Sequence, residues 1–195
     1  NLFGMGGAPL CTIARGKGDQ KEAESIMGNS FILLLISGAV LTVLGLLLKE
    51  PLLYAFGASA ETFPFADQYI TIYLCGSIFV MISLGMNSFI NSQGFGRVGM
   101  TTVLCGAVAN IILDPIFIFT FQMGIQGAAL ATVLSQFLSA MWVLWFLTGK
   151  KAILRLKKEC FRLKWKRICS ITALGTTGFT MSITNCAVQI ICNST

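Results

Sequence analysis

The stretch at residues 110–136 reads NIILDPIFIFTFQMGIQGAALATVLSQ and carries one charged side chain, Asp114. Asp114 is also the only Asp, Glu, Lys or Arg between Val98 and Gly149, a run far longer than the ~20 residues that cross a bilayer. An Asp at the centre of a membrane helix costs about 2.5–3.5 kcal/mol, and such residues usually face a protein interior or a watery cavity. The stretch therefore predicts a membrane protein with a functional carboxylate.

The composition of the whole chain agrees with this prediction. Of 195 residues, 55% are hydrophobic and 11% are charged, with a mean hydropathy of +0.78. The apolar runs are too long and too uniform for barrel strands, so helices are the remaining structure that satisfies the backbone in lipid. We expect an all-α polytopic membrane protein with spans at 26–48, 68–90, 98–120, 126–148 and 171–193. The polar and glycine-rich residues 122–127 should form the turn between the third and fourth of these spans.

The two ends of the sequence predict a fragment of a longer polypeptide. No initiator Met or signal peptide opens the chain, and residues 1–14 read as the end of an earlier helix. The last predicted span runs to the end of the sequence. Partner helices from the missing remainder of the polypeptide should therefore cover polar faces such as that around Asp114.

The basic residues predict an orientation in the membrane. Nine of the fourteen Lys and Arg residues fall between Lys150 and Arg167, which lie between two predicted spans. Alternating loops place four more on the same side and leave Lys49 alone on the other, so the positive-inside rule makes the basic side cytoplasmic in a plasma or inner membrane. Nothing independent supports nucleic-acid binding, and the segment at 149–170 reads as a basic connector between two bundles. The four additional residues are Arg15, Lys17, Lys21 and Arg97.

The chain offers little for enzymatic chemistry. It has seven Cys and no His, without a CxxC pair, so neither a zinc site nor a disulfide framework is indicated and we expect no cofactor. An intramembrane enzyme would need a catalytic pair or a metal set, whereas the spans contain a single acid. We therefore predict that the protein is not an enzyme.

Asp114 has neighbours that favour ion handling. Asn110 lies four residues earlier on the same helical face, and Pro115 follows immediately, which frees a backbone carbonyl from its helical hydrogen bond. Carboxylate, amide and carbonyl oxygens together suit a desolvated proton or a small cation such as Na⁺. The alternative is an Asp that stabilises the proline kink or bonds to a neighbouring helix.

The next helix has a face of small residues for close packing: Gly127, Ala131, Ser135 and Ser139. Thr132 and Gln136 lie beside that face, and Thr132 should reach about the same depth as Asp114 on the antiparallel neighbour. A hydroxyl could then meet the carboxylate, although a membrane Thr commonly bonds to its own helix carbonyl instead.

A second polar face lies on the span at 68–90. Asn87 and Asn91 are four residues apart, with Gln93 just beyond them. These amides could line a cavity, and bonding between helices is an equally good interpretation.

Several of these motifs together resemble the multidrug and toxic compound extrusion (MATE) family of cation-coupled exporters. The similar segments are GGAPLCTIARGKGDQKEAE, PLLYAFGAS, NSFINSQGFGRVGM, NIILDPIFIFTFQMGIQGAALATVLSQ and ALGTTGFTMSITNCAVQIICN, the last after a basic linker. The resemblance implies twelve helices in two six-helix lobes. It assigns residues 1–148 to most of the amino-terminal lobe, 149–170 to a cytoplasmic inter-lobe linker, and 171–195 to the truncated first helix of the second lobe.

The resemblance also implies roles for individual residues. Asp114 would be the ion-coupling carboxylate, Asn110 its amide ligand and Thr132 a hydroxyl ligand, whereas Asn87 and Tyr69 would line the substrate cavity. We expect Gln136 to be a further cavity residue.

The implied function is export of drugs or organic cations in exchange for Na⁺ or H⁺, by alternating access between two lobes. The expected partners are these small molecules, the lipid bilayer and the rest of the polypeptide. One alternative is a lipid-linked oligosaccharide flippase of the same superfamily, which would need a more cationic cavity than these spans provide. Another is an intramembrane protein without transport activity, which would not need Asp114.

Overall fold

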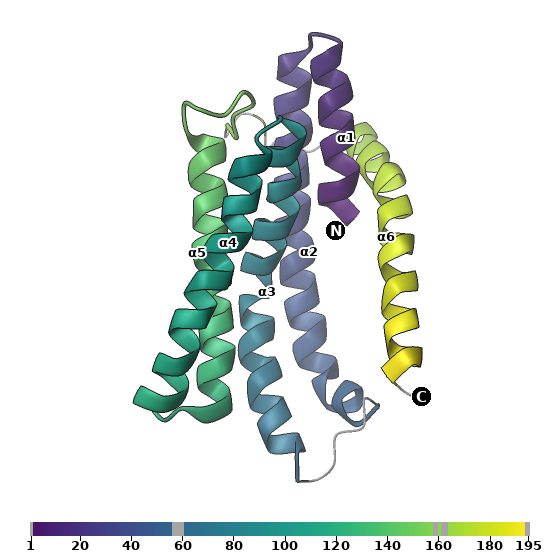
Figure 1. Ribbon diagram of the computed structural model, residues 1–195. Helices are drawn as coiled ribbons and strands as arrows, with labels where there is room; N and C mark the ends of the chain where they lie inside the picture. Colours follow the sequence, from purple (N-terminus) through teal and green to yellow (C-terminus); the bar gives the residue numbers. More distant parts are fainter. Residues whose placement is uncertain (1, 56–60, 158–159, 161–163, 194–195) are drawn as a thin grey trace.

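The computed structural model describes residues 2–55, 61–157, 160 and 164–193, and all of the long regular elements in this part of the chain are helices. They follow one another as long antiparallel rods (Figure 1). Their bounds are α1 Leu2–Gly16, α2 Gln20–Ala55, α3 Phe63–Ser92, α4 Gly96–Pro115, the short η1 Ile116–Thr120, α5 Gly124–Thr148 and α6 Trp165–Asn193. The predicted all-α fold is confirmed.

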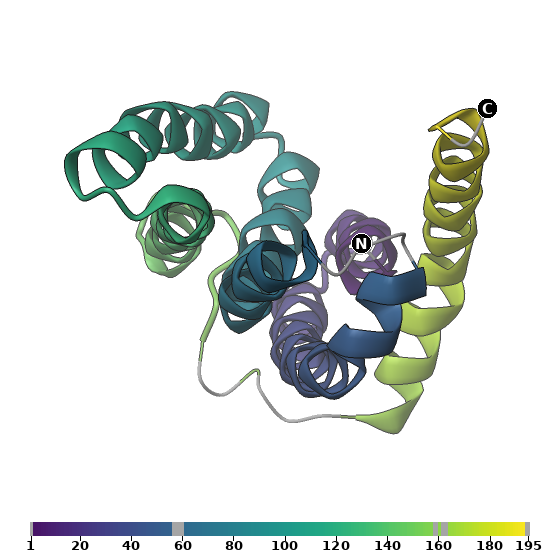
Figure 2. The same cartoon turned by 90° about the horizontal axis from the view of Figure 1, so that it is seen from below.

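Helix α3 occupies the centre of the bundle. It packs against α1 and α2 on one side and against α4 and α5 on the other. Helix α6 lies against α1, on the far side of the bundle from α4 and α5 (Figure 2). The pair formed by α4 and α5 is therefore open to its surroundings along one side.

Four helices in the described part of the chain are long and apolar enough to cross a membrane. They are Gln20–Tyr54, Phe63–Ser92, Gly96–Thr120 and Gly124–Thr148, and each contains one predicted span with at most six further residues at either end. The fifth predicted span, 171–193, is helical within α6, but α6 is not one of these four. That α6 crosses the membrane stays a prediction.

The predicted turn at 122–127 is present. Gln122 and Gly124 adopt φ angles of 53° and 54° between η1 and α5, so the chain reverses where the sequence indicated. The turn between α1 and α2 uses Gly18 at φ 80°, a left-handed conformation that glycine adopts without steric cost. The carboxylate of Asp19 then accepts a hydrogen bond of 3.0 Å from the backbone N–H of Glu22, which caps the start of α2.

Helix α1 approaches three neighbours at glycines. A methyl group at Gly4 would lie 2.8 Å from the carbonyl oxygen of Gly85 in α3, and one at Gly6 would lie 2.7 Å from the backbone nitrogen of Gly175 in α6. Gly7 faces Ser30 of α2. Small residues allow backbones to come this close, and such contacts are a main source of helix association in lipid.

The small-residue face predicted on α5 is confirmed. Gly127, Ala131, Ser135 and Ser139 are all buried. Ser139 donates a hydrogen bond of 3.2 Å to the backbone carbonyl of Thr102 in α4, so the two helices are joined by a polar contact as well as by packing.

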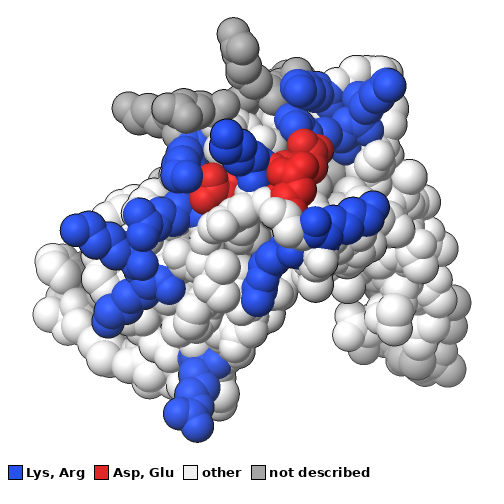
Figure 3. All heavy atoms as spheres, turned by 90° about the horizontal axis from the view of Figure 1, so that it is seen from above, with Lys and Arg blue, Asp and Glu red and all other residues white. Residues whose placement is uncertain are grey.

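Lys and Arg side chains gather at one end of the bundle, which we call the basic end (Figure 3), and residues 152–157 fold back onto this end. Gln93, only 4% exposed, accepts a hydrogen bond of 2.9 Å from the backbone N–H of Leu154. Glu24, only 6% exposed, accepts hydrogen bonds from the Arg155 backbone N–H at 3.3 Å and from Lys157 Nζ at 2.8 Å. Residues 152–157 are thus attached to the turns of the first four helices.

The contact with Glu24 raises the pKa of Lys157 above its ordinary value, chiefly through the hydrogen bond. Because the pKa of Lys157 is raised in the folded protein, its contact with Glu24 contributes fully to stability at pH values below the ordinary lysine pKa. This contribution is lost as the pH rises through the raised pKa. The contact therefore persists at neutral pH.

Replacing Gly6 by Ala should lower stability. The added methyl group meets the backbone of α6, which cannot move away as a flexible side chain can, and overpacking of this kind costs about 1–3 kcal/mol. We expect a lower melting temperature for Gly6→Ala in detergent. Gly16→Ala is the matched control in the same helix, because no atom lies within 4 Å of its added methyl group. Equal melting temperatures for the two variants would contradict the close packing of α1 on α6.

Replacing Glu24 by Ala should release the connector. The hydrogen bond from the Arg155 backbone N–H is lost, which is worth about 1–1.5 kcal/mol, and the contact with Lys157 is lost as well, so trypsin cleavage after Lys151 or Arg155 should accelerate about tenfold or more. Glu61→Ala, which removes an exposed acid from the opposite end, should leave the cleavage rate unchanged. An unchanged rate in Glu24→Ala would show that the connector is held by other contacts.

Candidate functional site

Asp114 and Asn110 form a direct pair within α4. The amide nitrogen Nδ2 of Asn110 donates a hydrogen bond of 3.3 Å to Oδ1 of Asp114, as their spacing of four residues predicts. Both side chains are half-buried. Because the amide nitrogen faces the carboxylate, the amide oxygen of Asn110 remains available to another ligand.

The backbone changes immediately after this pair. Pro115 has no N–H, so the carbonyl of Ile111 cannot receive the regular helical hydrogen bond. Residues Ile116–Thr120 continue as a wider π-helical turn, in which the N–H of Phe121 bonds to the carbonyl of Ile116 at 3.0 Å. Wider turns of this kind often occur at functional sites in membrane and soluble helices. Sequence reasoning located the proline but not the π-helical turn.

The hydroxyl of Thr132 donates a hydrogen bond of 2.9 Å to the carbonyl of Ala128 in its own helix. Within the described residues it is therefore not hydrogen-bonded to Asp114, and the commoner behaviour of a membrane Thr applies. Since the hydroxyl proton is used in this bond, the lone pairs of its oxygen remain available.

Polar side chains from α3, α4 and α5 line a small cavity of about 70 Å³. Ser83 donates a hydrogen bond of 2.9 Å to Oε1 of Gln136, and Asn87 Nδ2 donates one of 3.2 Å to the carbonyl of Gly99. Asn87 Oδ1 is buried and has no hydrogen-bond partner among the described residues. Two predicted cavity residues, Asn87 and Gln136, thus line one cavity.

Ser83 and Thr102 are cavity residues that sequence reasoning missed. Ser83 precedes Asn87 by four residues, so extending the polar face of α3 by one turn would have found it. Thr102 carries no comparable signal, because its neighbours in α4 are mostly apolar.

Tyr69 does not line this cavity. It lies 18 residues before Asn87, which is about 27 Å along α3, and stacks on Tyr73 with ring centroids 6.2 Å apart. Nearby, Asp67 forms a salt bridge of 2.7 Å with Lys49 that joins α2 and α3 at the end opposite the basic end.

The described residues contain no group of three or more His, Cys, Asp or Glu side chains that could hold a metal ion. Asp114 is the one acid near the polar side chains of α4. The oxygens around it come from one carboxylate, an amide and backbone carbonyls, a set that suits a proton or a weakly bound monovalent cation better than a transition metal.

The family model MatE matches residues 1–116, which is more than half of the chain. The chain belongs to the MatE family. Among curated relatives, it is 28% identical over 183 residues to the multidrug export protein MepA of Staphylococcus saprophyticus. That match covers 94% of this chain and 41% of MepA, so the chain spans less than half the length of the relative.

Solved structures of this family share the fold. A MATE structure in the bent conformation matches with a TM-score of 0.86 at 27% identity, over 93% of this chain and 42% of that one. An inward-facing multidrug resistance MATE transporter of the MOP superfamily matches with a TM-score of 0.84 at 26% identity, over 90% and 40%. The chain is thus a multi-pass membrane protein of a transporter family and not an enzyme.

Replacing Ser83 by Ala should destabilise the contact between α3 and α5. The change removes the hydrogen bond from the buried Ser83 to the half-buried Gln136, which costs about 0.5–1.5 kcal/mol. We expect a lower melting temperature in detergent than for Ser88→Ala, where the exposed hydroxyl bonds only to its own helix. If both variants have the same melting temperature, the Ser83–Gln136 hydrogen bond contributes nothing measurable to stability.

Proposed function

We propose that the full-length protein exports drugs or organic cations in exchange for Na⁺ or H⁺, with Asp114 as the coupling carboxylate. The observation that carries the proposal is the Asn110–Asp114 hydrogen bond beside Pro115 in an otherwise uncharged span. A carboxylate is costly at this depth unless it exchanges its proton or cation with a watery cavity. The relatives named as multidrug exporters support the substrate class.

The geometry supports a cation or proton site at Asp114. The orientation of Asn110 leaves its amide oxygen free, and Pro115 leaves the Ile111 carbonyl without its regular donor. Thr132 on α5 supplies a third oxygen whose lone pairs remain available. A Na⁺ ion would draw on oxygens from both helices, whereas a proton needs only the carboxylate.

The cavity between α3, α4 and α5 supports a place for substrate or water about two helical turns from Asp114, since Gly106 is the lining residue of α4 nearest to it in the sequence. Asn87 and Gln136 line it from two helices, and the unpartnered Oδ1 of Asn87 can accept a hydrogen bond there. A volume of about 70 Å³ is sufficient for about two water molecules at ~30 Å³ each. An organic cation would therefore need this space to widen as the helices move.

The basic end is proposed to face the cytoplasm, on the positive-inside rule. The residues up to 148 would then form most of one lobe, 149–170 the inter-lobe linker, and α6 the first helix of the second lobe. The inward-facing conformation of a similar transporter supports alternating access between two such lobes.

Replacing Asp114 by Asn in the full-length protein should abolish coupling. The shape of the side chain is kept while the negative charge and the exchangeable proton are lost, so efflux driven by the ion gradient should be lost. Efflux of a fluorescent organic cation is measured from everted vesicles under an imposed Na⁺ gradient and then under a pH gradient.

Asp19→Asn is the matched control. It is the same substitution at the cap of α2, where Asn caps a helix as well as Asp, so efflux should be unchanged. The gradient on which wild-type efflux depends identifies the coupling ion. Normal efflux by Asp114→Asn under both gradients would overturn the proposal and leave Asp114 as a structural partner of the kink.

A further inference from the structure

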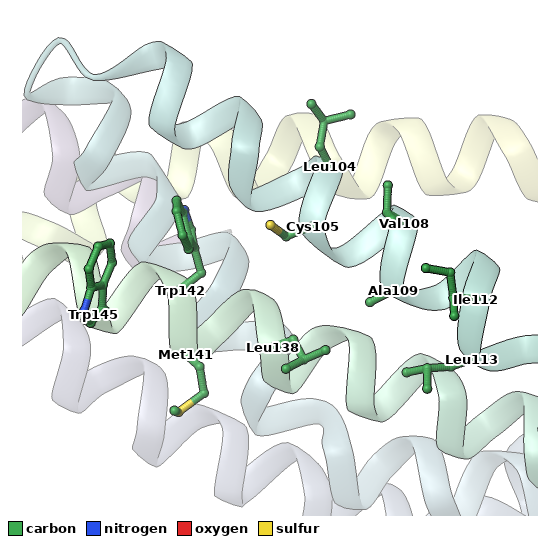
Figure 4. A pocket seen from close by; sticks show the side chains of 10 residues that line it. All are labelled: Leu104, Cys105, Val108, Ala109, Ile112, Leu113, Leu138, Met141, Trp142 and Trp145. Carbon is green, nitrogen blue, oxygen red and sulfur yellow. The ribbon is translucent and has the colours of Figure 1, made fainter.

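An apolar groove runs along the open side of the α4–α5 pair (Figure 4). It has a volume of about 820 Å³ and is lined only by apolar side chains and one Cys. Val108 and Ile112 of α4 and Met141 of α5 stand 52–54% exposed along it. Exposed apolar side chains are more stable in contact with hydrocarbon than with water, so the groove is suited to an apolar ligand.

The groove lies on the opposite side of α4 from the proposed ion site. Cys105, one of its lining residues, precedes Asp114 by nine residues, which is two and a half turns of helix at 3.6 residues per turn. Asp114 and the groove therefore face different surroundings. If Asp114 faces the interior of the transporter, the groove faces the bilayer.

The dimensions of the groove fit one acyl chain. Its α4 wall from Leu104 to Leu113 rises about 14 Å at 1.5 Å per residue. This is close to half of the ~30 Å hydrocarbon core, which is the depth of a single leaflet. Leu138 of α5 forms part of the facing wall.

Two tryptophans mark one end of the groove. The rings of Trp142 and Trp145 lie 5.4 Å apart at the part of α5 nearest the basic end (Figure 4). The indole N–H of Trp142 is buried and has no hydrogen-bond acceptor among the described residues. A buried indole N–H usually finds an acceptor, so this donor suits an oxygen of a ligand once the ring turns to expose it to the groove.

The same end is positively charged. Trp145 also lines a second cavity of about 320 Å³ together with Gly149, Lys150 and Lys151. Both lysines are exposed and directly follow α5. The apolar groove thus continues, across Trp145, into a place for an anionic group.

We propose that this surface binds one anionic phospholipid from the leaflet at the basic end. An acyl chain lies in the groove between α4 and α5, an ester or phosphate oxygen accepts the hydrogen bond of Trp142, and the headgroup phosphate pairs with Lys150 and Lys151. Tryptophan at the interface and lysine just beyond it are the side chains expected at these depths. The site is independent of the proposed export function.

The test measures phospholipid bound to the purified full-length protein by native mass spectrometry. Phosphatidylglycerol and phosphatidylcholine with the same acyl chains are added in turn to protein stripped of lipid. Wild type should hold one phosphatidylglycerol more tightly than phosphatidylcholine. Lys150→Gln with Lys151→Gln should weaken phosphatidylglycerol binding about thirtyfold, given roughly 1 kcal/mol for each lysine near a membrane surface. Phosphatidylcholine binding should weaken less, because the choline cation offsets the charge of its phosphate.

Two further variants test the rest of the site. Ala109→Phe places a ring in the groove and should weaken both lipids. Trp142→Phe keeps the ring and removes the N–H, so it should weaken phosphatidylglycerol binding with the fold intact. Lys17→Gln with Lys21→Gln is the matched control, since it removes the same charge from the α1–α2 turn and should change nothing.

Three outcomes would overturn the proposal. Equal losses in the two double-lysine variants would show general attraction to a basic surface. Equal binding of the two lipids by wild type would show that the protein does not select an anionic headgroup. Retained binding in both Ala109→Phe and Trp142→Phe would show that another segment of the polypeptide or a second copy covers the groove. If efflux driven by the ion gradient still depends on Asp114 in each of these cases, the proposed export function stands although the lipid site does not.

Discussion

The fold depends on how closely the backbone of α1 can approach its neighbours. In a bilayer, apolar side chains gain little by leaving lipid for protein, so close van der Waals packing and a few polar contacts hold the helices together. Gly4, Gly6 and Gly7 place α1 against α3, α6 and α2, and each contact would be blocked by a single methyl group. The central position of α3, and through it the place of α4 and α5, follows from this packing.

Helix α4 separates two environments. On one side it carries Asp114 and Asn110, and on the other it presents an apolar wall that continues onto α5. The seam between the two helices is closed by small residues, and Ser139 bonds across it to Thr102. Because the seam contains so little side-chain volume, polar and apolar surfaces lie within the width of one helix of each other.

Features that depend on residues close together in the sequence were predictable. Charge-free runs predicted five spans, and four of them coincide with helices long and apolar enough to cross a membrane. The glycines and glutamines at 122–127 predicted the turn, and a spacing of four residues predicted the Asn110–Asp114 bond. Contacts between distant segments were not predictable. The bond from Leu154 to Gln93 joins residues 61 apart, and no local pattern shows which amide a loop will meet. Tyr69 lies about 27 Å along α3 from Asn87, so its place in a substrate cavity stays a prediction.

The proposed ligand oxygens are divided between two helices, and this division has a mechanical consequence. Asp114 and Asn110 move with α4 as one rigid unit, whereas Thr132 belongs to α5. A cation that needed oxygens from both would act as a clamp, resisting any sliding of one helix along the other until it left. A proton would exert no such force, because it is satisfied by α4 alone. The same three residues would therefore stiffen the seam under Na⁺ and leave it free to shear under H⁺.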